Sequence, residues 1–538
     1  MLPDALTYAA LYRDFRWQIP ARYNIGTDVC TRWALADPDR PAIIWQRPNG
    51  QVETVSFGRL EDESNRLANV LNARGIRRGD RVAIILSQGP AAAIAHIAIY
   101  KMGAIAVPLA ALFGPDALAF RLANSGARAL LTNAEGAAKL ADIRDGLGEL
   151  SVVLSSDGRA DGVDSLADAM DRASPRFTAV DTAPDDPAMM IYTSGTTGPP
   201  KGALHGHRVL LGHLPGIQMP HEFFPQAGDR MWTPADWAWA GGLLNALLPA
   251  LHYGVPVVAR KFEKFDPDEA YALMATMEVR NSFVPPTALR MLRAVDDPRS
   301  RYDLKLRTLA SAGETLGAET FAWGRDVLGL TVNEAYGQTE CNLVIGSCAA
   351  IGVSRAGAIG KPVPGHTVGI IRADGSLCDA GEQGQIAVKR PDPVMFLEYW
   401  GRPEATRDKF IGDWMTTGDQ GVRDDEDYIR FFGRDDDVIT SAGYRIGPGE
   451  IEDTLIKHPA VSLAAAVGKP DPLRTEIVKA FVVLKAGVEP STDLADHIRD
   501  FVRTRMSAHS YPRELEFIDE MPMTTTGKII RRLLRDRS

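Results

Sequence analysis

The stretch YTSGTTGPPKG, residues 192–202, contains three glycines, four Ser or Thr hydroxyls and one lysine. It directly follows a short apolar run, Met189–Tyr192, which is expected to form a buried strand. Glycines let a backbone approach a ligand closely, and successive backbone N–H groups in such a loop form a concavity that binds anions. The stretch therefore predicts a loop that binds a polyphosphate at the end of a strand.

The loop is not a Walker A motif. That motif requires Gly-Lys-Ser/Thr, whereas here Pro200 precedes Lys201 and Gly202 follows it. The alternative is a solvated turn rich in Gly, Ser and Thr. The length and order of the loop and its place after a strand favour the phosphate-binding interpretation.

Composition limits the class of protein. A chain of 538 residues exceeds the size at which a single hydrophobic core keeps growing, so at least two domains are expected. The formal net charge of −9 argues against a nucleic-acid-binding protein, which needs a basic face. The four cysteines form no CxxC pair and show no metal-ligand spacing, which favours a reducing compartment.

The sequence predicts a cytoplasmic protein without a membrane span. Its first residues lack the basic segment and apolar core of a signal peptide. The most apolar stretch, Ala91–Leu112, is interrupted by His96, Lys101, Gly103 and Pro108, and a membrane-spanning helix needs a longer uninterrupted run.

Alternating patterns predict an α/β fold. Strands are expected at Val82–Leu86, Ala129–Thr132, Val152–Leu154 and Met189–Tyr192, and a helix at Pro90–Met102. Short buried strands that alternate with helices indicate mostly parallel sheets. The first 433 residues are therefore expected to form a large domain of several subdomains.

The last hundred residues follow a different pattern, which predicts a small, mobile α+β domain over residues 438–538. Strands are expected at Leu463–Gly468, Val478–Leu484 and Leu515–Ile518, and an amphipathic helix at Asp493–Arg505. The charged residues 434–437 between the two regions are expected to be an exposed linker.

Further motifs follow the loop: SAGET (residues 311–315), NEAYGQTE (333–340), WMTTGD (414–419), FGRDDD (432–437), SAGYRI (441–446) and PMTTTGK (522–528). In this order, and over nearly the whole chain, they resemble the adenylate-forming superfamily, which includes acyl-CoA synthetases, adenylation domains and firefly luciferase. The motifs are most similar to those of medium-chain acyl-CoA synthetases. One departure is that Cys341 and Asn342 follow the Thr-Glu pair, where the family usually has a glycine after one further residue.

The resemblance implies an acid–thiol ligase that uses ATP, Mg²⁺ and coenzyme A. Lys528, Glu340 and Thr196 are expected to be catalytic, with Glu340 and Thr196 holding the metal. Asp436 corresponds to the hinge residue. The resemblance assigns the nucleotide to Thr193, Ser194, Gly195, Thr197, Gly198, Lys201, Gly313, Glu314, Thr315, Glu334, Ala335, Tyr336, Gly337, Gln338, Thr339, Asp419, Arg434 and Arg445. It assigns CoA to Ala442, Gly443, Tyr444, Arg474, Arg503, Tyr511, Pro512 and Arg513.

The acyl pocket is expected at Trp239, Ala240, Gly241, Ala312 and Gly337. Acetate-specific members carry a tryptophan where this chain has Gly337, and bulkier residues at Ala240, Gly241 and Ala312. The resemblance therefore implies room for a medium-chain or branched monocarboxylic acid, with an aromatic or short-chain acid as the alternative. On this basis a Gly337→Trp variant is expected to prefer acetate or propionate.

Other readings stay open at this stage. The chain could load a carrier protein instead of CoA, carry out luciferase-like oxygen chemistry, or be a non-catalytic relative, although intact Lys528, Glu340 and Asp419 argue against the last. Acylation of Lys528 by a regulatory enzyme is also a hypothesis, because it removes a charge that the chemistry needs.

Overall fold

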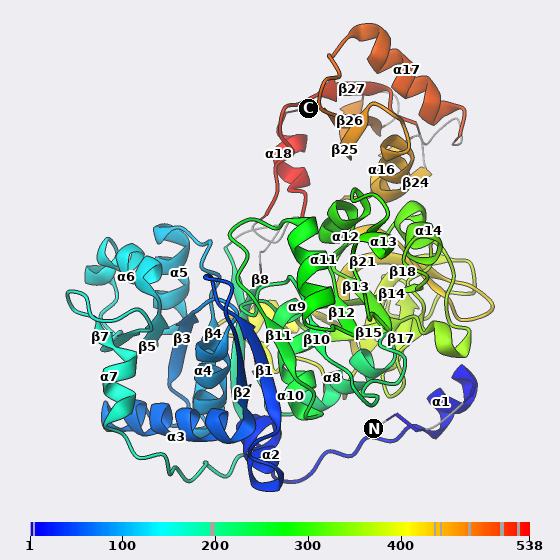
Figure 1. The fold of residues 1–538 in the computed structure, drawn as a ribbon. Coiled ribbons are helices and arrows are strands. Elements are labelled where there is room, and N and C mark those ends of the chain that lie inside the picture. The colour runs from blue at the N-terminus through cyan, green and yellow to red at the C-terminus, as the bar shows by residue number, and fades with distance from the viewer. Residues whose placement is uncertain are drawn as a thin grey trace.

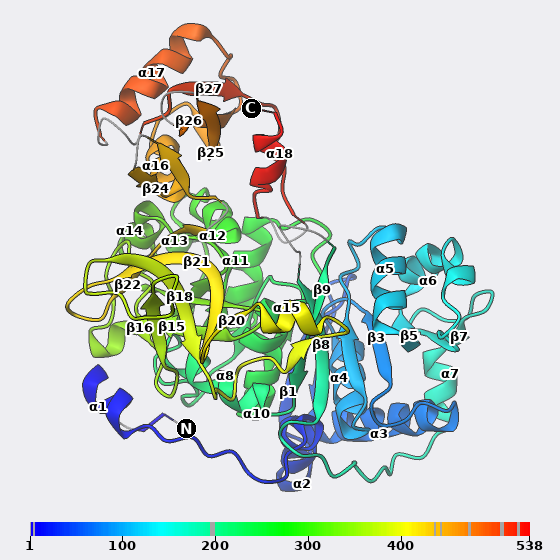
Figure 2. The ribbon, with the colours of Figure 1, turned by 180° about the vertical axis from the view of Figure 1, so that it is seen from behind.

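The computed structural model describes residues 2–3, 6–193, 199–434, 437–441, 444–471, 475–505, 511–524 and 528–537. The chain folds into a large body and a smaller C-terminal unit that stands on one end of it (Figures 1 and 2). Among these residues no helix is long and apolar enough to cross a membrane. All four cysteines are free and buried.

The first sheet has eight strands, and those at its centre are parallel. Across the sheet they are β19 (Glu398–Tyr399), β9 (Lys201–Gly206), β8 (Pro187–Thr193), β4 (Ile105–Pro108), β3 (Arg81–Ile85), β5 (Ala127–Thr132), β6 (Val152–Ser155) and β7 (Asp164–Ser165). The strands β9 and β19 are added antiparallel at one edge, so the chain that follows the phosphate loop returns beside β8.

The second sheet has nine strands. Its order is β16 (Lys361–Pro362), β15 (Asn342–Gly346), β14 (Val332–Gln338), β13 (Thr308–Ala312), β12 (Asn281–Phe283), β10 (Met231–Trp232), β11 (Val257–Ala259), β1 (Pro41–Gln46) and β2 (Val52–Ser56). The predicted motif at residues 333–340 begins within β14 and continues into the turn that leads to the antiparallel strand β15.

The third sheet is antiparallel and was not anticipated from the sequence. It consists of β17 (Val368–Ile371), β18 (Gln383–Lys389), β21 (Trp414–Arg423) and β20 (Phe410–Ile411), and β22 (Ile429–Arg434) pairs with β21. The pairing places Asp419 opposite Arg434.

The C-terminal unit is built on a fourth sheet, made of β24 (Tyr444–Ile446), β23 (Ile439–Ser441), β26 (Thr475–Leu484), β25 (Val461–Asp471) and β27 (Glu514–Phe517). Its helices are α16 (Pro448–Ile456), α17 (Thr492–Arg503) and α18 (Arg531–Arg535). The α17 helix buries Ile498 and Val502 against the sheet, as its amphipathic pattern predicts.

The remaining helices lie against the sheets of the body (Figure 1). Those that matter below are α3 (Phe57–Ala73), α4 (Pro90–Lys101), α5 (Pro115–Ser125), α8 (Val209–Gln218), α9 (Ala240–Gly242), the π-helix η3 (Leu243–Leu247) and α12 (Pro286–Arg293). The apolar α4 is a buried core helix, in which the Lys101 ammonium pairs with Glu61 of α3 at 2.7 Å.

These observations confirm the predicted fold class, an α/β body with mostly parallel sheets and a small α+β unit. Each element expected near residues 82–102, 129–132, 152–154 and 189–192 is present, with ends that differ by a few residues. The predicted domain limits, 1–433 and 438–538, stay predictions, as does the hinge at Asp436, which lies outside the described residues.

Candidate functional site

The two legs of the phosphate loop are the strands β8 and β9, which pair antiparallel so that Thr193 lies opposite Lys201. The Thr193 hydroxyl donates to the Lys201 carbonyl over 3.4 Å. The buried Tyr192 side chain donates to Asn124 Oδ1 of α5 over 2.7 Å, which fixes the base of the loop. The strands on either side of the predicted phosphate loop are therefore paired and held in place.

Several predicted site residues lie outside the described part of the chain. They are Ser194, Gly195, Thr196, Thr197 and Gly198 of the loop, the hinge residue Asp436, and Ala442, Gly443 and Arg474 of the expected CoA site. The backbones of Tyr444 and Arg445 belong to β24. The roles of all these residues stay predictions.

The hairpin after β14 carries Glu340, and its backbone explains the departure from the family motif. Asn342 has a positive φ of 47°, a conformation that asparagine tolerates better than most residues. It therefore occupies the family's glycine position without a large backbone penalty.

Gly337, at the other side of this hairpin, is required by close backbone approach. A Cβ atom on Gly337 would lie 1.2 Å from the Asn342 carbonyl oxygen. Any side chain at 337 must displace the hairpin that carries Glu340. The expectation that Gly337→Trp simply fills an acyl pocket is therefore wrong for this backbone, because the missing side chain faces the hairpin and not an open space.

Glu340 is buried, with 7% of its surface exposed, and one phenol holds it. Its Oε1 accepts a hydrogen bond from the Tyr399 hydroxyl of β19. Its Oε2 accepts no hydrogen bond from any residue that the structure describes. A buried carboxylate with one free oxygen suits a hard cation such as Mg²⁺, which takes one or two protein carboxylates and completes its shell with phosphates and water. No cluster of three or more His, Cys, Asp or Glu residues competes for a metal within the described chain.

Asp419 lies at the centre of a second network. Its Oδ2 accepts hydrogen bonds from the Tyr336 hydroxyl at 2.5 Å and from Gln338 Nε2 at 2.8 Å. Burial raises the pKa of Asp419, and the bonds from Tyr336 and the nearby Arg434 charge oppose that rise. Its Oδ1 has no hydrogen-bond donor among the described residues, so it can accept from a ligand diol.

The two networks share one strand. Tyr336 and Gln338 lie in β14, four and two residues before Glu340, respectively. Gln338 also accepts a long hydrogen bond of 3.4 Å from Lys409. The centroid of the Tyr336 ring lies 6.4 Å from that of the Phe431 ring. Phe431 therefore adds a second aromatic ring next to the one predicted to contact a nucleotide base.

Side chains of α12 hold the segment that is predicted to line adenine. Gly313 has φ +103°, which permits the sharp turn after β13. The Glu314 carboxylate is engaged by Arg290 of α12 at 2.9 Å and by the Thr287 hydroxyl. Since the Glu314 side chain is already bound within the protein, it anchors the segment. The segment can therefore contact a ligand through the backbone of residues 313–315.

Glu334 lies next to this segment, where α16 of the C-terminal unit approaches the body. Burial raises its pKa to about 8; the Leu316 N–H, which donates to it at 3.4 Å, opposes the rise and the Asp453 charge adds to it. Burial likewise raises the pKa of Asp453 to about 6. A Cβ on Gly317 would lie 3.2 Å from Asp453 Oδ1, so the small residue lets α16 come close.

Lys528 is an exposed residue of the C-terminal unit and is hydrogen-bonded to Thr524. Its N–H donates to the Thr524 hydroxyl at 3.0 Å, and its carbonyl accepts from the Thr524 N–H at 2.7 Å. The segment that leads into α18 extends from the C-terminal unit toward the end of the body where β8 and β9 lie (Figures 1 and 2).

The expected CoA residues that the structure describes lie on the C-terminal unit. Arg503 is paired with Asp500 at 3.1 Å on the exposed face of α17. The Arg513 guanidinium lies over the Tyr511 ring at 5.1 Å, next to the buried Pro512. These contacts leave the arginines near the surface, where a phosphate can reach them.

The expected acyl residues lie between the first two sheets. Trp239 packs edge-on against Phe113 at 5.6 Å, and Ala240 and Gly241 open α9, which leads into the π-helix η3. A Cβ on Gly241 would lie 3.4 Å from the Phe283 ring and 4.0 Å from the Ala235 Cβ, which are ordinary van der Waals contacts, so this position tolerates a side chain. Ala312 is buried at the end of β13.

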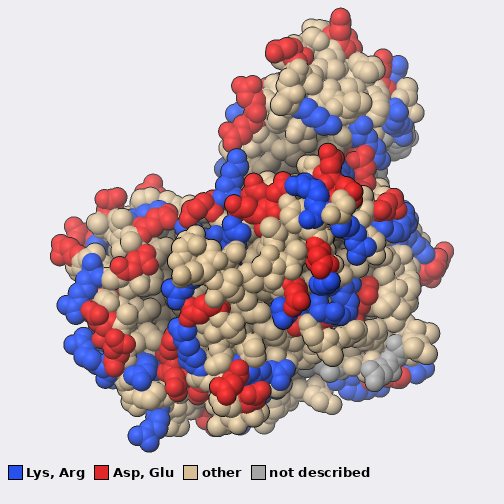
Figure 3. All heavy atoms as spheres, in the orientation of Figure 1, with Lys and Arg blue, Asp and Glu red and all other residues tan. Residues whose placement is uncertain are grey.

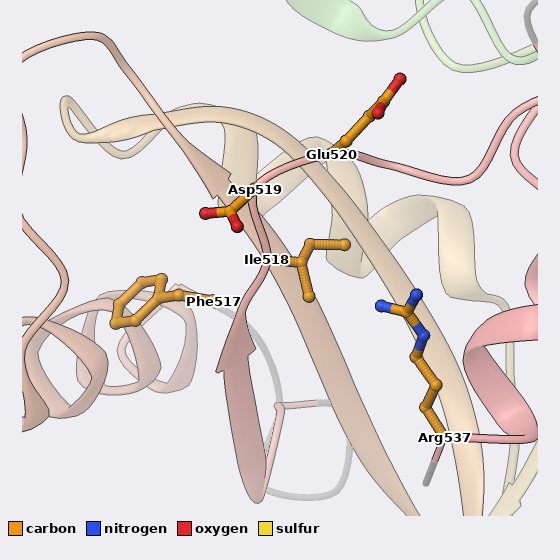
Figure 4. A pocket seen from close by; sticks show the side chains of 5 residues that line it. All are labelled: Phe517, Ile518, Asp519, Glu520 and Arg537. Atoms are coloured by element: carbon orange, nitrogen blue, oxygen red, sulfur yellow. The ribbon is translucent and has the colours of Figure 1, made fainter.

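The face of the molecule shown in Figure 3 has no dominant charge. The face shown in Figure 3 carries Asp and Glu interspersed with Lys and Arg, including at the junction of the two units. A hollow in the C-terminal unit is lined by Phe517, Ile518, Asp519, Glu520 and Arg537 (Figure 4). None of these five belongs to the predicted site, and the hollow combines both signs of charge.

Comparison with known proteins was decisive. The profile described as AMP-binding enzyme matches residues 30–400, and that of the AMP-binding enzyme C-terminal domain matches residues 450–528. The chain belongs to the AMP-binding enzyme family. The predictions of an acid–thiol ligase of the acyl-CoA synthetase class that uses ATP, Mg²⁺ and CoA are thereby confirmed at the level of the family.

Individual relatives span nearly the whole chain. The acetyl-coenzyme A synthetase of Bacillus subtilis (strain 168) is 33% identical, covering 98% of this chain and 94% of its own. The mitochondrial acyl-coenzyme A synthetase ACSM3 of Rattus norvegicus is 32% identical, with 98% and 93% covered. The solved structure of the anthranilate CoA ligase AuaEII in complex with anthranoyl-AMP has a TM-score of 0.89 at 29% identity, with 96% and 98% covered.

Within this family site, sequence reasoning missed Tyr399 and Asn124. Tyr399 lies 59 residues beyond Glu340 and outside every motif quoted above. Its only sequence signal is the aromatic run Tyr399-Trp400 after an apolar segment, which does not indicate a carboxylate partner. Asn124 sits in a helix far from the loop in sequence, and only the fold brings it to Tyr192.

The raised pKa of Glu334 predicts a pH-dependent difference in stability. Because the folded protein keeps this carboxyl protonated up to about pH 8, whereas the ordinary value is 4.5, the folded state binds more protons between these values. Its contribution to stability is full below about pH 4.5 and is lost as pH rises through 8. Glu334→Gln avoids this loss, so its gain in melting temperature over wild type should be larger at pH 8.5 than at pH 5.5, by roughly 2 °C.

Thermal unfolding of both proteins at the two pH values measures this gain. The exposed Glu149→Gln is the matched control and should show no such pH dependence. A gain in melting temperature for Glu334→Gln that is equal at both pH values would contradict a raised pKa for Glu334.

Proposed function

We propose that the chain is an ATP-dependent acid:CoA ligase that forms acyl-CoA, AMP and pyrophosphate through an acyl-adenylate. Its acid is a medium-chain or branched monocarboxylic acid. One observation carries the nucleotide part of the proposal: β14 and its hairpin connect Tyr336 and Gln338, bonded to Asp419, with Glu340, bonded to Tyr399. A ribose acceptor, an aromatic wall and a metal ligand are thereby held next to the strands of a phosphate hairpin.

In the first half-reaction, a carboxylate oxygen of the acid attacks the α-phosphorus of ATP and pyrophosphate leaves. Asp419 Oδ1 would accept from the ribose hydroxyls, and the β8–β9 hairpin with Lys201 would hold the leaving phosphates. Lys528 would donate to the oxygens on which charge develops. When bound at Glu340, Mg²⁺ offsets the charge of the polyphosphate. Positioning and electrostatic stabilisation supply most of such a step.

In the second half-reaction, the CoA thiol attacks the acyl carbonyl and AMP leaves. The proposal places CoA on the C-terminal unit, where Arg503 and Arg513 lie near the surface. Guanidinium groups recognise phosphate by two parallel hydrogen bonds. Rotation of this unit about the predicted hinge would exchange Lys528 for the segment around Gly443 between the two steps. A phosphopantetheinylated carrier protein is the alternative acceptor.

The proposed acid class rests on small residues at one end of the site. Ala240, Gly241 and Ala312 contribute little volume, and the adjoining η3 and α8 present leucines to the core. Gly337 no longer supports this inference, because the Asn342 backbone fills the place of its side chain. The remaining residues favour an apolar acid larger than acetate.

An aromatic acid is the second candidate. The structural relative solved with anthranoyl-AMP has a TM-score of 0.89, and a benzoate CoA ligase from Burkholderia xenovorans LB400 has one of 0.84 at 26% identity. Both align over at least 95% of this chain. A flat ring could stack between Trp239 and the α9 backbone in place of a flexible chain.

The acid is tested by measuring AMP and acyl-CoA formation with linear, branched and aromatic acids, each with CoA, with a carrier protein, or with neither acceptor. We expect the highest kcat/KM for a linear acid of medium length or a branched acid, with CoA as acceptor. A clear preference for benzoate-like acids would replace the proposed acid class, and turnover with the carrier alone would replace the acceptor.

Gly241→Val should narrow the range of acids. The added methyl groups occupy space toward Phe283, so kcat/KM for the longest accepted acid should fall roughly tenfold more than that for the shortest. Gly146→Val, at an exposed position with open space around it, is the matched control. An unchanged chain-length profile in Gly241→Val would remove this residue from the acyl pocket.

Lys528→Ala should separate the half-reactions. Loss of a preorganised charge donor should slow acyl-adenylate formation by roughly 10²–10³. Conversion of supplied acyl-AMP and CoA into acyl-CoA should stay within a few-fold of wild type. Lys485→Ala, an exposed lysine of the same unit, should alter neither step. Equal loss of both half-reactions would contradict the assignment of Lys528 to acyl-adenylate formation.

Two earlier hypotheses also stay proposals. A cytoplasmic location is one of them. The other is reversible acylation of Lys528, whose exposure leaves it accessible to a modifying enzyme. Incubation with an acyl donor that leaves Lys528 unmodified would remove the second.

A further inference from the structure

The segment 396–400, termed the strap, ties the phosphate hairpin to the Glu340 hairpin. The Phe396 N–H donates to the Glu340 carbonyl at 2.8 Å, and the Leu397 N–H donates to the Leu204 carbonyl at 2.7 Å. Further along, the Trp400 N–H donates to the Gly202 carbonyl at 2.8 Å. In Figure 2 the yellow segment before α15 (Pro403–Arg407) runs beside β8 and β9, in agreement with the pairing of β19 with β9.

Tyr399 is the side chain by which the strap enters the site. It is 3% exposed, and its hydroxyl donates to Glu340 Oε1. The Lys201 ammonium lies over its ring, 4.8 Å from the centroid. The Phe396 ring packs on it at 4.9 Å, with an angle of 59° between the planes. One side chain therefore touches both the expected metal ligand and the lysine of the phosphate loop.

We propose that Tyr399 is a positioning residue for adenylation: its hydroxyl orients the Glu340 carboxylate toward the cation, and its ring holds the Lys201 ammonium beside the same phosphates. This inference rests on the proposed function, which supplies the cation and the phosphates. It gives Tyr399 no contact with substrate.

The physical need for such a residue follows from the burial of Glu340. A carboxylate that is withdrawn from water is costly unless donors replace its hydration. A single donor on Oε1 meets part of that need, fixes the plane of the carboxyl group and leaves Oε2 for a cation. The electron-rich face of the Tyr399 ring also attracts the Lys201 ammonium that lies over it.

The hydroxyl stays a donor at all pH values at which the enzyme is expected to work. Burial, and then the negative charge of Glu340, raise the pKa of the Tyr399 phenol well above its ordinary value. The geometry of the bond, with the hydroxyl as donor and Glu340 Oε1 as acceptor, is what the proposal uses.

The competing explanation is that Tyr399 only fills the core between the strap and the hairpin. Tyr399→Phe separates the two explanations, because it keeps the ring, its packing on Phe396 and its contact with Lys201 while removing the donor. Tyr428→Phe is a matched control. Tyr428 is also a buried tyrosine with a lysine over its ring, Lys361 at 4.7 Å, but its hydroxyl donates to a backbone carbonyl, that of Gly352, at 3.1 Å.

The experiment is calorimetric titration of the full chain with ATP at a series of Mg²⁺ concentrations, without acid or CoA. In Tyr399→Phe, the Mg²⁺ concentration for half-maximal ATP affinity should rise about tenfold, because the charge-assisted bond to Glu340 is lost. The melting temperature should stay within about 2 °C of wild type. Tyr428→Phe should leave the Mg²⁺ requirement unchanged.

A double-variant cycle completes the test. In a Glu340→Gln background, which lacks the ionised partner, Tyr399→Phe should cause no further change in the Mg²⁺ requirement. An unchanged Mg²⁺ requirement in Tyr399→Phe alone, or an additive loss in the double variant, would overturn the positioning role. Failure of the wild-type protein to bind ATP at any Mg²⁺ concentration would instead overturn the proposed function itself.

Discussion

Two buried carboxylates, Glu340 and Asp419, impose the main constraint on this structure, and a tyrosine hydroxyl holds each of them. Tyr399 donates to Glu340, and Tyr336 donates to Asp419. Burial raises the pKa of both phenols, so both remain donors. In each carboxylate the second oxygen takes no hydrogen bond from the described residues, which leaves a buried but accessible acceptor for a cation or a diol.

These partners come from three different sheets, and this explains the arrangement of the body. Tyr399 and Lys201 belong to the first sheet, Tyr336 and the Glu340 hairpin to the second, and Asp419 to the third. The strap and β14 are the segments that join the sheets at this point. A displacement of any one sheet would therefore leave a buried charge without its donor, so the pairs restrain the relative positions of the sheets as well as those of the ligand groups.

The sequence indicated the fold class and most of the candidate site residues. The residues that it did not indicate were missed for a physical reason. The loop at 192–202, the carboxylates and Lys528 could be proposed from the sequence because glycine-rich and charged motifs act through local backbone and charge. Tyr399 and Asn124 could not be proposed in this way, because their contacts exist only in the tertiary fold. Tyr399 is 59 positions from its partner in the sequence, and Asn124 is 68 positions from its partner. Gly337 was misinterpreted for the same reason, because a pattern of side-chain sizes does not show that the backbone of Asn342 lies where its Cβ would be.

The most direct measurement of acyl-adenylate chemistry at this site is the exchange of labelled pyrophosphate into ATP in the absence of CoA. Exchange reports the reversible first half-reaction alone. We predict exchange that requires both a carboxylic acid and Mg²⁺ and that falls at least tenfold in Asp419→Asn. AMP formation that depends on CoA without any exchange, or exchange that needs no acid, would contradict an acyl-adenylate intermediate.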